Sequence, residues 1–246
     1  MADVALHFID EQATGAHPGD ELELTGSEAH HAAAVRRVRQ GEAVTLGDGR
    51  GTWLDGEVIE AEPKRVRIRV TAARVEDPAR PRVVLAQALA KGDRDELAVQ
   101  AATELGVDEV VPWQAARSVS RWEGQKARKG RDRWRAIVRE AAKQAHRAWI
   151  PEVTEPATTA QLAARAAGAL MVVLDPWTDA PLSALDVADA AELILVVGPE
   201  GGIAPDELER LEAAGARRAR LGATVLRTST AGPAALAVLN ARLGRW

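Results

Sequence analysis

LILVVGPEGGIAPDELERL, residues 193–211, is the stretch of sequence that decides the fold. It begins with an uninterrupted apolar run, which is typical of a parallel strand covered on both faces. A glycine-rich turn at 198–202 follows, and Pro205 then opens a helical pattern. Glycines between a buried strand and a helix let a ligand approach the backbone closely. The stretch therefore predicts an α/β fold with a ligand-binding loop at a strand end; a tight turn with a helix cap is the alternative.

The residues of this loop argue against a phosphate ligand. Their glycine spacing matches neither G-x-G-x-x-G nor the P-loop. Three acidic side chains, Glu200, Asp206 and Glu207, lie in the loop and at the helix start, where they repel phosphate. S-adenosylmethionine, an adenosine that carries a sulfonium cation, suits a glycine loop with a carboxylate. We therefore expect S-adenosylmethionine as the ligand.

The pattern of apolar residues divides the chain into two domains. Further strand-like apolar runs at 83–89 and 169–174 extend the α/β pattern over residues 83–246. Residues 1–74 instead contain short alternating runs separated by turn signals, which favours a compact β-barrel-like domain. Between them, residues 75–82 combine two prolines with charged residues and suit a linker.

Composition excludes several classes of function. The chain of 246 residues has no cysteine, so disulfides, thiolate metal sites and cysteine nucleophiles are excluded. The N-terminus lacks the pattern of a signal peptide, and no apolar run approaches the length of a membrane span. We expect a cytoplasmic protein with no membrane partner and no metal.

Charge is distributed unevenly along a chain whose formal net charge is -4. Residues 117–147 contain eleven Lys or Arg and three acidic residues, a local charge of +8, which suits a phosphate-binding surface. Glycines in its first part predict a mobile loop. Trp122, Trp134 and Trp149 lie in or beside the segment, where exposed indoles would stack on unpaired bases. A solvated helix face with tryptophans in the core is the alternative.

A second polar segment, LGATVLRTSTAGPAA at 221–235, precedes an apolar helix expected from Ala234 to Leu243. It contains a lone arginine, Arg227, next to several hydroxyl side chains. Taken alone, the segment is typical of a helix cap.

Together, GPEGG at 198–202 and LRTSTA at 226–231 resemble the SPOUT class of methyltransferases, and specifically the RsmE family of 16S rRNA uracil-N3 methyltransferases. Several upstream motifs follow in the family's order: KGDR at 91–94, TELGV at 103–107, Pro112, Arg117-Ser118, and EAA at 140–142 with Gln144 and Arg147. His30-His31 and Val38-Arg39 before Gly41 resemble the family's PUA-like RNA-binding module. The resemblance spans almost the whole chain.

The resemblance implies a fold, a cofactor and a set of roles. It implies a PUA-like β-barrel domain followed by an α/β SPOUT domain with a deep trefoil knot, in a homodimer. The S-adenosylmethionine site would comprise Leu174, Gly198, Pro199, Glu200, Gly201, Gly202, Leu221, Gly222, Val225 and Leu226. Arg227, with Ser229 and Thr230, would act on the target uracil. The RNA-binding residues would be His30, Arg36, Arg39, Lys91, Arg94, Arg117, Arg121, Arg128, Lys129, Arg131, Gln144 and Arg147.

Three positions depart from the family's pattern. Ser229 replaces a frequent acidic residue, Ala101 a frequent lysine, and His146 the small residue that precedes Arg147. The identity of a general base is therefore open, as are the target nucleotide and the choice between free 16S rRNA and the assembled small subunit.

Three other functions compete with uracil-N3 methylation. A 2′-O or other SPOUT RNA methyltransferase would share the knot. A non-enzymatic rRNA-binding assembly factor would use the same basic surface but leaves GPEGG unexplained. A dinucleotide-dependent dehydrogenase is disfavoured by the glycine spacing and the acidic helix start.

Overall fold

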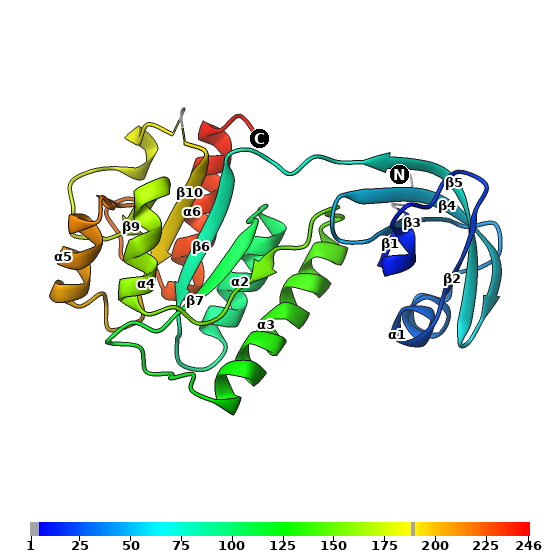
Figure 1. The fold of residues 1–246 in the computed structure, drawn as a ribbon, viewed down its shortest axis with the longest axis horizontal. Helices are drawn as coiled ribbons and strands as arrows, with labels where there is room; N and C mark the ends of the chain where they lie inside the picture. Colours follow the sequence, from blue (N-terminus) through cyan, green and yellow to red (C-terminus); the bar gives the residue numbers. More distant parts are fainter. Residues whose placement is uncertain (1–4, 188–189) are drawn as a thin grey trace. The chain divides into compact units, whose positions relative to one another are not determined.

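The computed structural model describes residues 5–187 and 190–246, which form two compact units. Unit 1 comprises Met1–Pro78 and Ala142–Ile150, and unit 2 comprises Ala79–Ala141 and Pro151–Trp246. Residues 142–150 thus group with unit 1, although the sequence pattern places them inside the range 83–246. Figure 1 shows the elements of each unit.

Unit 1 is built on a five-stranded mixed sheet. Strand β1 pairs with β3 in parallel, and the other neighbours pair antiparallel. The strands, in sheet order, are β1 (Leu6–Ile9), β3 (Ala43–Gly47), β4 (Thr52–Glu62), β5 (Arg65–Val75) and β2 (Glu21–Leu24). The connections contain η1 (Glu11–Ala13), α1 (Gly26–His30) and η2 (His31–Val35), a π-helical turn.

The core of unit 1 follows the alternation of its strands. In β5, Val66, Ile68 and Val70 are buried, whereas arginines occupy the alternate positions 65, 67 and 69. The core includes Phe8, Leu46, Leu54, Val58 and Ile68. Outward-facing Arg67 forms ion pairs with Glu21 and Glu60, which explains the alternating charges of β5 as paired surface residues.

Unit 2 is a six-stranded, wholly parallel sheet with helices on both faces. Its strands, in sheet order, are β11 (Arg217–Ala219), β9 (Leu170–Leu174), β10 (Glu192–Val197), β6 (Arg82–Ala88), β7 (Glu109–Trp113) and β8 (Glu152–Val153). The three apolar runs expected to be strands are β6, β9 and β10. An α/β fold is confirmed.

The helices that cover this sheet are α2 (Arg94–Glu104), α4 (Thr159–Ala164), α5 (Pro205–Ala213) and α6 (Thr228–Arg242), with two short 3-10 turns, η3 (Arg165–Gly168) and η4 (Leu182–Ala184). Figure 1 shows α2 and α6 on one face, and α4 and α5 on the other. Along β10, Ile194 and Val196 pack in the cluster that contains Leu162 of α4 and Leu211 of α5. Helix α6 begins at Thr228, six residues before the expected start.

The first part of the basic segment, expected as a mobile loop from Gly124 and Gly130, is irregular only as far as Gly124; from Gln125 on it is a helix. Helix α3 runs from Gln125 to Gln144. Gly130 lies within it because Trp122 occupies the space of a side chain: a Cβ atom there would lie 2.5 Å from the indole. Trp134 is buried and meets Trp122 edge to face, at 5.1 Å between ring centroids. The prediction of exposed indoles is therefore wrong for Trp134, which is a core residue.

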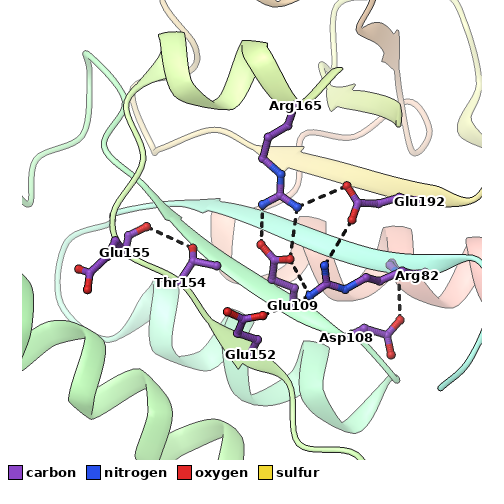
Figure 2. Close-up of polar contacts among 9 residues, drawn as sticks. Arg82, Asp108, Glu109, Glu152, Thr154, Glu155, Arg165 and Glu192 are labelled. Atoms are coloured by element: carbon purple, nitrogen blue, oxygen red, sulfur yellow. Dashed lines mark hydrogen bonds and ion pairs between the residues drawn. The ribbon is translucent and has the colours of Figure 1, made fainter. Parts of the chain in front are cut away.

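Charged residues form a closed network at the N-terminal edge of the parallel sheet (Figure 2). Glu109 begins β7 and is 3% exposed. Its carboxylate forms ion pairs with Arg82, at 2.9 Å between Nη2 and Oε2, and with Arg165. Glu192, at the start of β10, contacts the same two arginines. Nearby, the Asp108 carboxylate accepts a hydrogen bond from the backbone N–H of Val83 at 2.8 Å. Arg82 also pairs with Glu152 at 3.3 Å, so the network links the starts of β6, β7, β8 and β10.

Within the described ranges, no helix is long and apolar enough to cross a membrane.

Candidate functional site

A cavity of about 820 Å³ opens at the opposite, C-terminal edge of the parallel sheet. The ends of β9, β10 and β11 and the loops that follow them form its walls. Ligands of open parallel sheets bind at this edge, and the volume lies in the usual range for small-molecule sites. All ten residues predicted for the cofactor site line it: Leu174, Gly198, Pro199, Glu200, Gly201, Gly202, Leu221, Gly222, Val225 and Leu226.

The loop after β10 has little room for side chains. A Cβ atom on Gly198 would lie 2.7 Å from Ile203 Cγ1, and one on Gly201 would lie 3.3 Å from Arg117 Cβ. Gly202 has φ +72°, a conformation that favours glycine, and its N–H donates to the Pro199 carbonyl at 2.9 Å. The glycines therefore keep the loop tight and its backbone accessible to the cavity.

Glu200 is held by cationic and backbone donors. Its carboxylate accepts from the backbone N–H of Lys91 at 3.1 Å and from the Arg94 guanidinium at 2.9 Å. Burial raises the pKa of Glu200, but backbone hydrogen bonds and Arg94 outweigh it and lower the pKa below the usual value. Arg117 donates to the Gly201 carbonyl at 3.1 Å. Arg94 and Arg117, predicted as RNA ligands, therefore belong to the cavity wall and brace its loop.

Thr228, which the sequence did not single out as a site residue, joins three elements at the base of the cavity. Its buried hydroxyl donates to the Gly198 carbonyl at 2.9 Å and accepts from Gln87 Nε2 at 2.8 Å. The end of β6, the loop after β10 and the first turn of α6 are thereby linked. The sequence signal was the row of hydroxyls after Arg227, but their partners lie far away in the chain.

Arg227 is exposed and lines the cavity as the residue that precedes α6. The neighbouring Ser229 and Thr230 lie in the first turn of that helix and are not part of the cavity lining. Arg227 therefore lies beside the predicted cofactor residues, whereas the hydroxyl groups of Ser229 and Thr230 lie outside the cavity lining.

The end of β9 contributes two further residues that the motifs did not indicate. Asp175 is nearly buried and forms an ion pair with Arg218 Nε at 2.9 Å. Its carboxylate also accepts from the backbone N–H of Trp177 at 3.0 Å. The Trp177 side chain is 81% exposed on the cavity lining. Asp175 thus fixes the turn that presents an indole to solvent.

The cavity is predominantly cationic. Its charged lining residues are five arginines and two carboxylates: Arg94, Arg117, Arg218, Arg220, Arg227, Asp175 and Glu200. Both carboxylates are paired with arginine, and Asp206 and Glu207 do not line the cavity, so the anionic surroundings expected from the sequence are not found. The cationic excess instead suits a polyanion at the cavity mouth.

The other predicted RNA-binding residues lie outside this cavity. In unit 2, Lys91, Arg121, Arg128 and Lys129 are exposed, whereas Arg131 pairs with Glu155. In unit 1, the candidates are His30, Arg36, Arg39, Gln144 and Arg147. Among described residues, no group of three or more His, Cys, Asp or Glu could hold a metal ion.

Comparison with known proteins identifies the family. A family described as RNA methyltransferase domain matches residues 77–240, and one described as RNA methyltransferase PUA domain matches residues 24–71. The chain belongs to this RNA methyltransferase family, which confirms the expectation from its ordered motifs.

Individual relatives match over most of their length. Ribosomal RNA small subunit methyltransferase E of Mycobacterium bovis is 47% identical, over 91% of this chain and 87% of the relative. The Bacillus subtilis protein of the same name is 30% identical over 95% of both chains. A methyltransferase from Legionella pneumophila, solved in complex with the bound cofactor SAM, is 29% identical and superposes with a TM-score of 0.82 over 98% of both chains.

Proposed function

We propose that this chain is an S-adenosylmethionine-dependent methyltransferase that modifies N3 of a uridine in 16S rRNA of the small ribosomal subunit. The observation that carries the proposal is the 820 Å³ cavity, where two glycine-containing loops meet at the C-terminal edge of a parallel sheet. Relatives at 47% and 30% identity are named for small-subunit rRNA methylation. The site of action that we propose is the cytoplasm.

The cavity fits the cofactor in volume and in chemistry. Its tight loop lies on the lining, and the apolar side chains Leu174, Val225 and Leu226 offer surfaces for an adenine ring. The Legionella relative was solved with SAM bound. When bound, S-adenosylmethionine supplies an electrophilic methyl group on sulfur. We assign the ten predicted cofactor residues to its binding.

In the proposed mechanism, Arg227 stabilises the anionic uracil. Loss of the N3 proton leaves negative charge on the imide, and a guanidinium at its oxygen edge lowers the cost of that charge. Asp175 and Glu200, the carboxylates on the cavity lining, are paired with arginines, so we propose that the proton leaves to solvent. For Ser229 and Thr230, in the first turn of α6, a role in orienting the base rests on the resemblance to the family alone.

We further propose a trefoil knot in unit 2 and a homodimer, both by resemblance to the family. Exposed apolar side chains at the cavity support the second, since Trp177 is 81% and Val225 65% exposed. We also propose residues 1–74 as the RNA-binding domain and 75–82 as the linker.

Nucleoside mass spectrometry tests the proposed function. Small subunits from a strain that lacks the enzyme would be incubated with the protein and S-adenosylmethionine, then digested. We expect 3-methyluridine to increase only when both are present. A 2′-O-methylated nucleoside would favour the sister activity, and RNA binding without any methylated product would favour an assembly factor.

A further inference from the structure

A second, smaller cavity lies in unit 1, and the proposed methyl transfer makes no use of it. Its volume is about 140 Å³, roughly that of four or five water molecules at about 30 Å³ each. Strand β1, the end of η2 and the end of α3 form its walls, so segments from both parts of unit 1 meet there. Its lining includes His7, His31, Arg36, Lys143 and His146.

His7 brings an unpaired polar atom to this cavity. The side chain is 6% exposed, stacks on Trp53 at 4.4 Å between ring centroids, and bonds Thr45 Oγ1 through Nδ1 at 2.9 Å. Its Nε2 atom is buried and has no hydrogen-bond partner within residues 5–187 and 190–246. Buried polar atoms normally have partners, so an unpaired one on a cavity wall points to a ligand.

The hydrogen bonds of Thr45 set the role of that atom. The Thr45 hydroxyl donates to the Leu6 carbonyl at 3.4 Å, so Nδ1 of His7 carries the proton of the His7–Thr45 bond. Burial, with His146 and Lys143 nearby, lowers the pKa of His7 to about 4 and keeps the ring neutral at physiological pH. Nε2 is therefore an acceptor, and its partner must present an N–H or O–H group.

His146 occupies a backbone position that normally belongs to glycine. Arg147 N–H bonds the Ala142 carbonyl at 2.9 Å and His146 N–H bonds the Lys143 carbonyl at 3.2 Å, the two bonds of a Schellman motif at the end of α3. His146 takes the left-handed position, with φ 52°. This is the position at which the sequence departs from the family's small residue. The departure places an imidazole 5.8 Å from the His7 ring.

The charges around the cavity favour an anion at its mouth. Lys143 is buried, and its ammonium group donates to both carboxylate oxygens of Glu28 at 3.1 Å. The charges of these two side chains therefore cancel. Arg36 is exposed on the lining and adds a positive charge. His31, edge to face with Phe8, completes an aromatic border.

We propose that this cavity binds one unpaired nucleobase of the RNA substrate, whose N–H edge donates to His7 Nε2 while His146 packs beside the ring and Arg36 contacts an adjoining phosphate. An aromatic border, a buried acceptor and an exposed guanidinium are the groups that recognise a splayed-out base in single-stranded RNA. The proposal rests on the proposed function, because it assumes an RNA substrate.

Two variants test it in the full chain, by RNA affinity and by thermal unfolding. The RNA probe is the small subunit isolated from a strain that lacks the enzyme, and affinity is measured by filter binding. His7→Phe keeps a ring on Trp53 and removes the acceptor. His146→Gly removes the imidazole and relieves the left-handed backbone. We expect RNA affinity to fall about five- to tenfold in each, the usual effect of one hydrogen bond or one stacking contact.

Stability separates this role from a structural one. If His146 were structural, its replacement would lower the unfolding temperature, whereas we expect His146→Gly to unfold above the wild-type temperature. His146→Gly decides this point, because His7→Phe also loses the Nδ1 hydrogen bond to Thr45. Arg37→Gly, at φ 55° and off the cavity lining, is the stability control and should also raise the unfolding temperature. His17→Phe, at an exposed histidine, should change neither quantity.

The outcomes also separate this proposal from the proposed function. If the wild-type protein methylates the small subunit and His7→Phe and His146→Gly both bind it within twofold of wild type, the nucleobase site is wrong and the enzyme assignment stands. If the wild-type protein transfers no methyl group to RNA, the proposed function fails first. If His7→Phe does not fold, His146→Gly alone decides.

Discussion

The two edges of the parallel sheet in unit 2 both gather charged residues, yet they differ in kind. At the N-terminal edge, Arg82 and Arg165 meet Glu109 and Glu192 in a closed network (Figure 2). At the C-terminal edge, five arginines face two carboxylates around an open cavity. Open volume, rather than the number of charged residues, therefore distinguishes a candidate site from a structural cluster.

The largest effect is expected at the C-terminal edge, from Arg227→Ala. If the guanidinium stabilises the uracil anion mainly in the transition state, the single-turnover rate should fall by about 10² to 10³, or roughly 3 to 4 kcal/mol. Affinities for RNA and S-adenosylmethionine should change far less. Arg227→Lys should recover only part of the rate, because a point charge replaces a planar fork.

The pH dependence of the same variant checks its cause. Raising the pH ionises uracil without help, so the gap between wild type and Arg227→Ala should narrow. A gap that is constant with pH, together with weaker RNA binding, would instead make Arg227 a phosphate anchor.

At the N-terminal edge, Glu109→Gln should affect stability and not the cofactor. The substitution leaves Arg82 and Arg165 with a neutral partner in a partly buried setting, at a cost of roughly 2 kcal/mol. Arg165 and Arg82 keep their contacts with Glu192, which limits the loss. Denaturant unfolding measures the change, and S-adenosylmethionine affinity should remain at the wild-type value. A weakened cofactor affinity in a folded Glu109→Gln protein would contradict the separation of the two edges.

A smaller effect is expected at Thr228, which supports the cavity from below. Thr228→Val keeps the shape but leaves Gln87 Nε2 and the Gly198 carbonyl without this hydroxyl. We expect about 1 to 2 kcal/mol of lost stability and weaker cofactor binding. Thr228→Ser, which keeps the hydroxyl, is the matched control and should bind the cofactor nearly as wild type does.

The smallest effect is expected on the salt dependence of RNA affinity, from the basic residues of α3. Exposed arginine and lysine side chains should contribute to it, whereas a side chain in an ion pair should not. Log affinity for RNA should fall linearly with log salt concentration, because phosphate contacts release counterions. Replacing Arg128 and Lys129 by Ala should flatten that slope by up to about two units, one for each phosphate contact. Arg131→Ala should change it little, because Arg131 pairs with Glu155. An unchanged slope in the double variant would show that Arg128 and Lys129 do not contact RNA phosphates.

The sequence predicted the features that depend on local pattern. Three apolar runs became β6, β9 and β10, and the glycine loop at 198–202 lies on the cavity wall. Arg227 was located by the resemblance to the family's motif, because local pattern alone indicated only a helix cap there.

Features that depend on distant contacts were not predictable. Gln87 and Thr228 lie 141 residues apart, so nothing local pairs them. Asp175 has an ordinary sequence context and gains its role only through Arg218. Gly130 of α3 indicated a loop because the indole that excludes a side chain there becomes visible only in three dimensions. For the same reason, the grouping of residues 142–150 with unit 1 could not be read from composition.

Calorimetric titration of S-adenosylmethionine into the wild-type protein and Gly201→Val tests the central claim most directly, namely that the C-terminal cavity holds the cofactor. A Cβ on Gly201 would lie 3.3 Å from Arg117 Cβ, so a branched side chain must push into the loop or the cavity. We predict saturable binding at one site per chain in the wild type, and none in a Gly201→Val protein that still unfolds cooperatively. Unchanged affinity in that variant would remove the loop from the cofactor site and contradict the account.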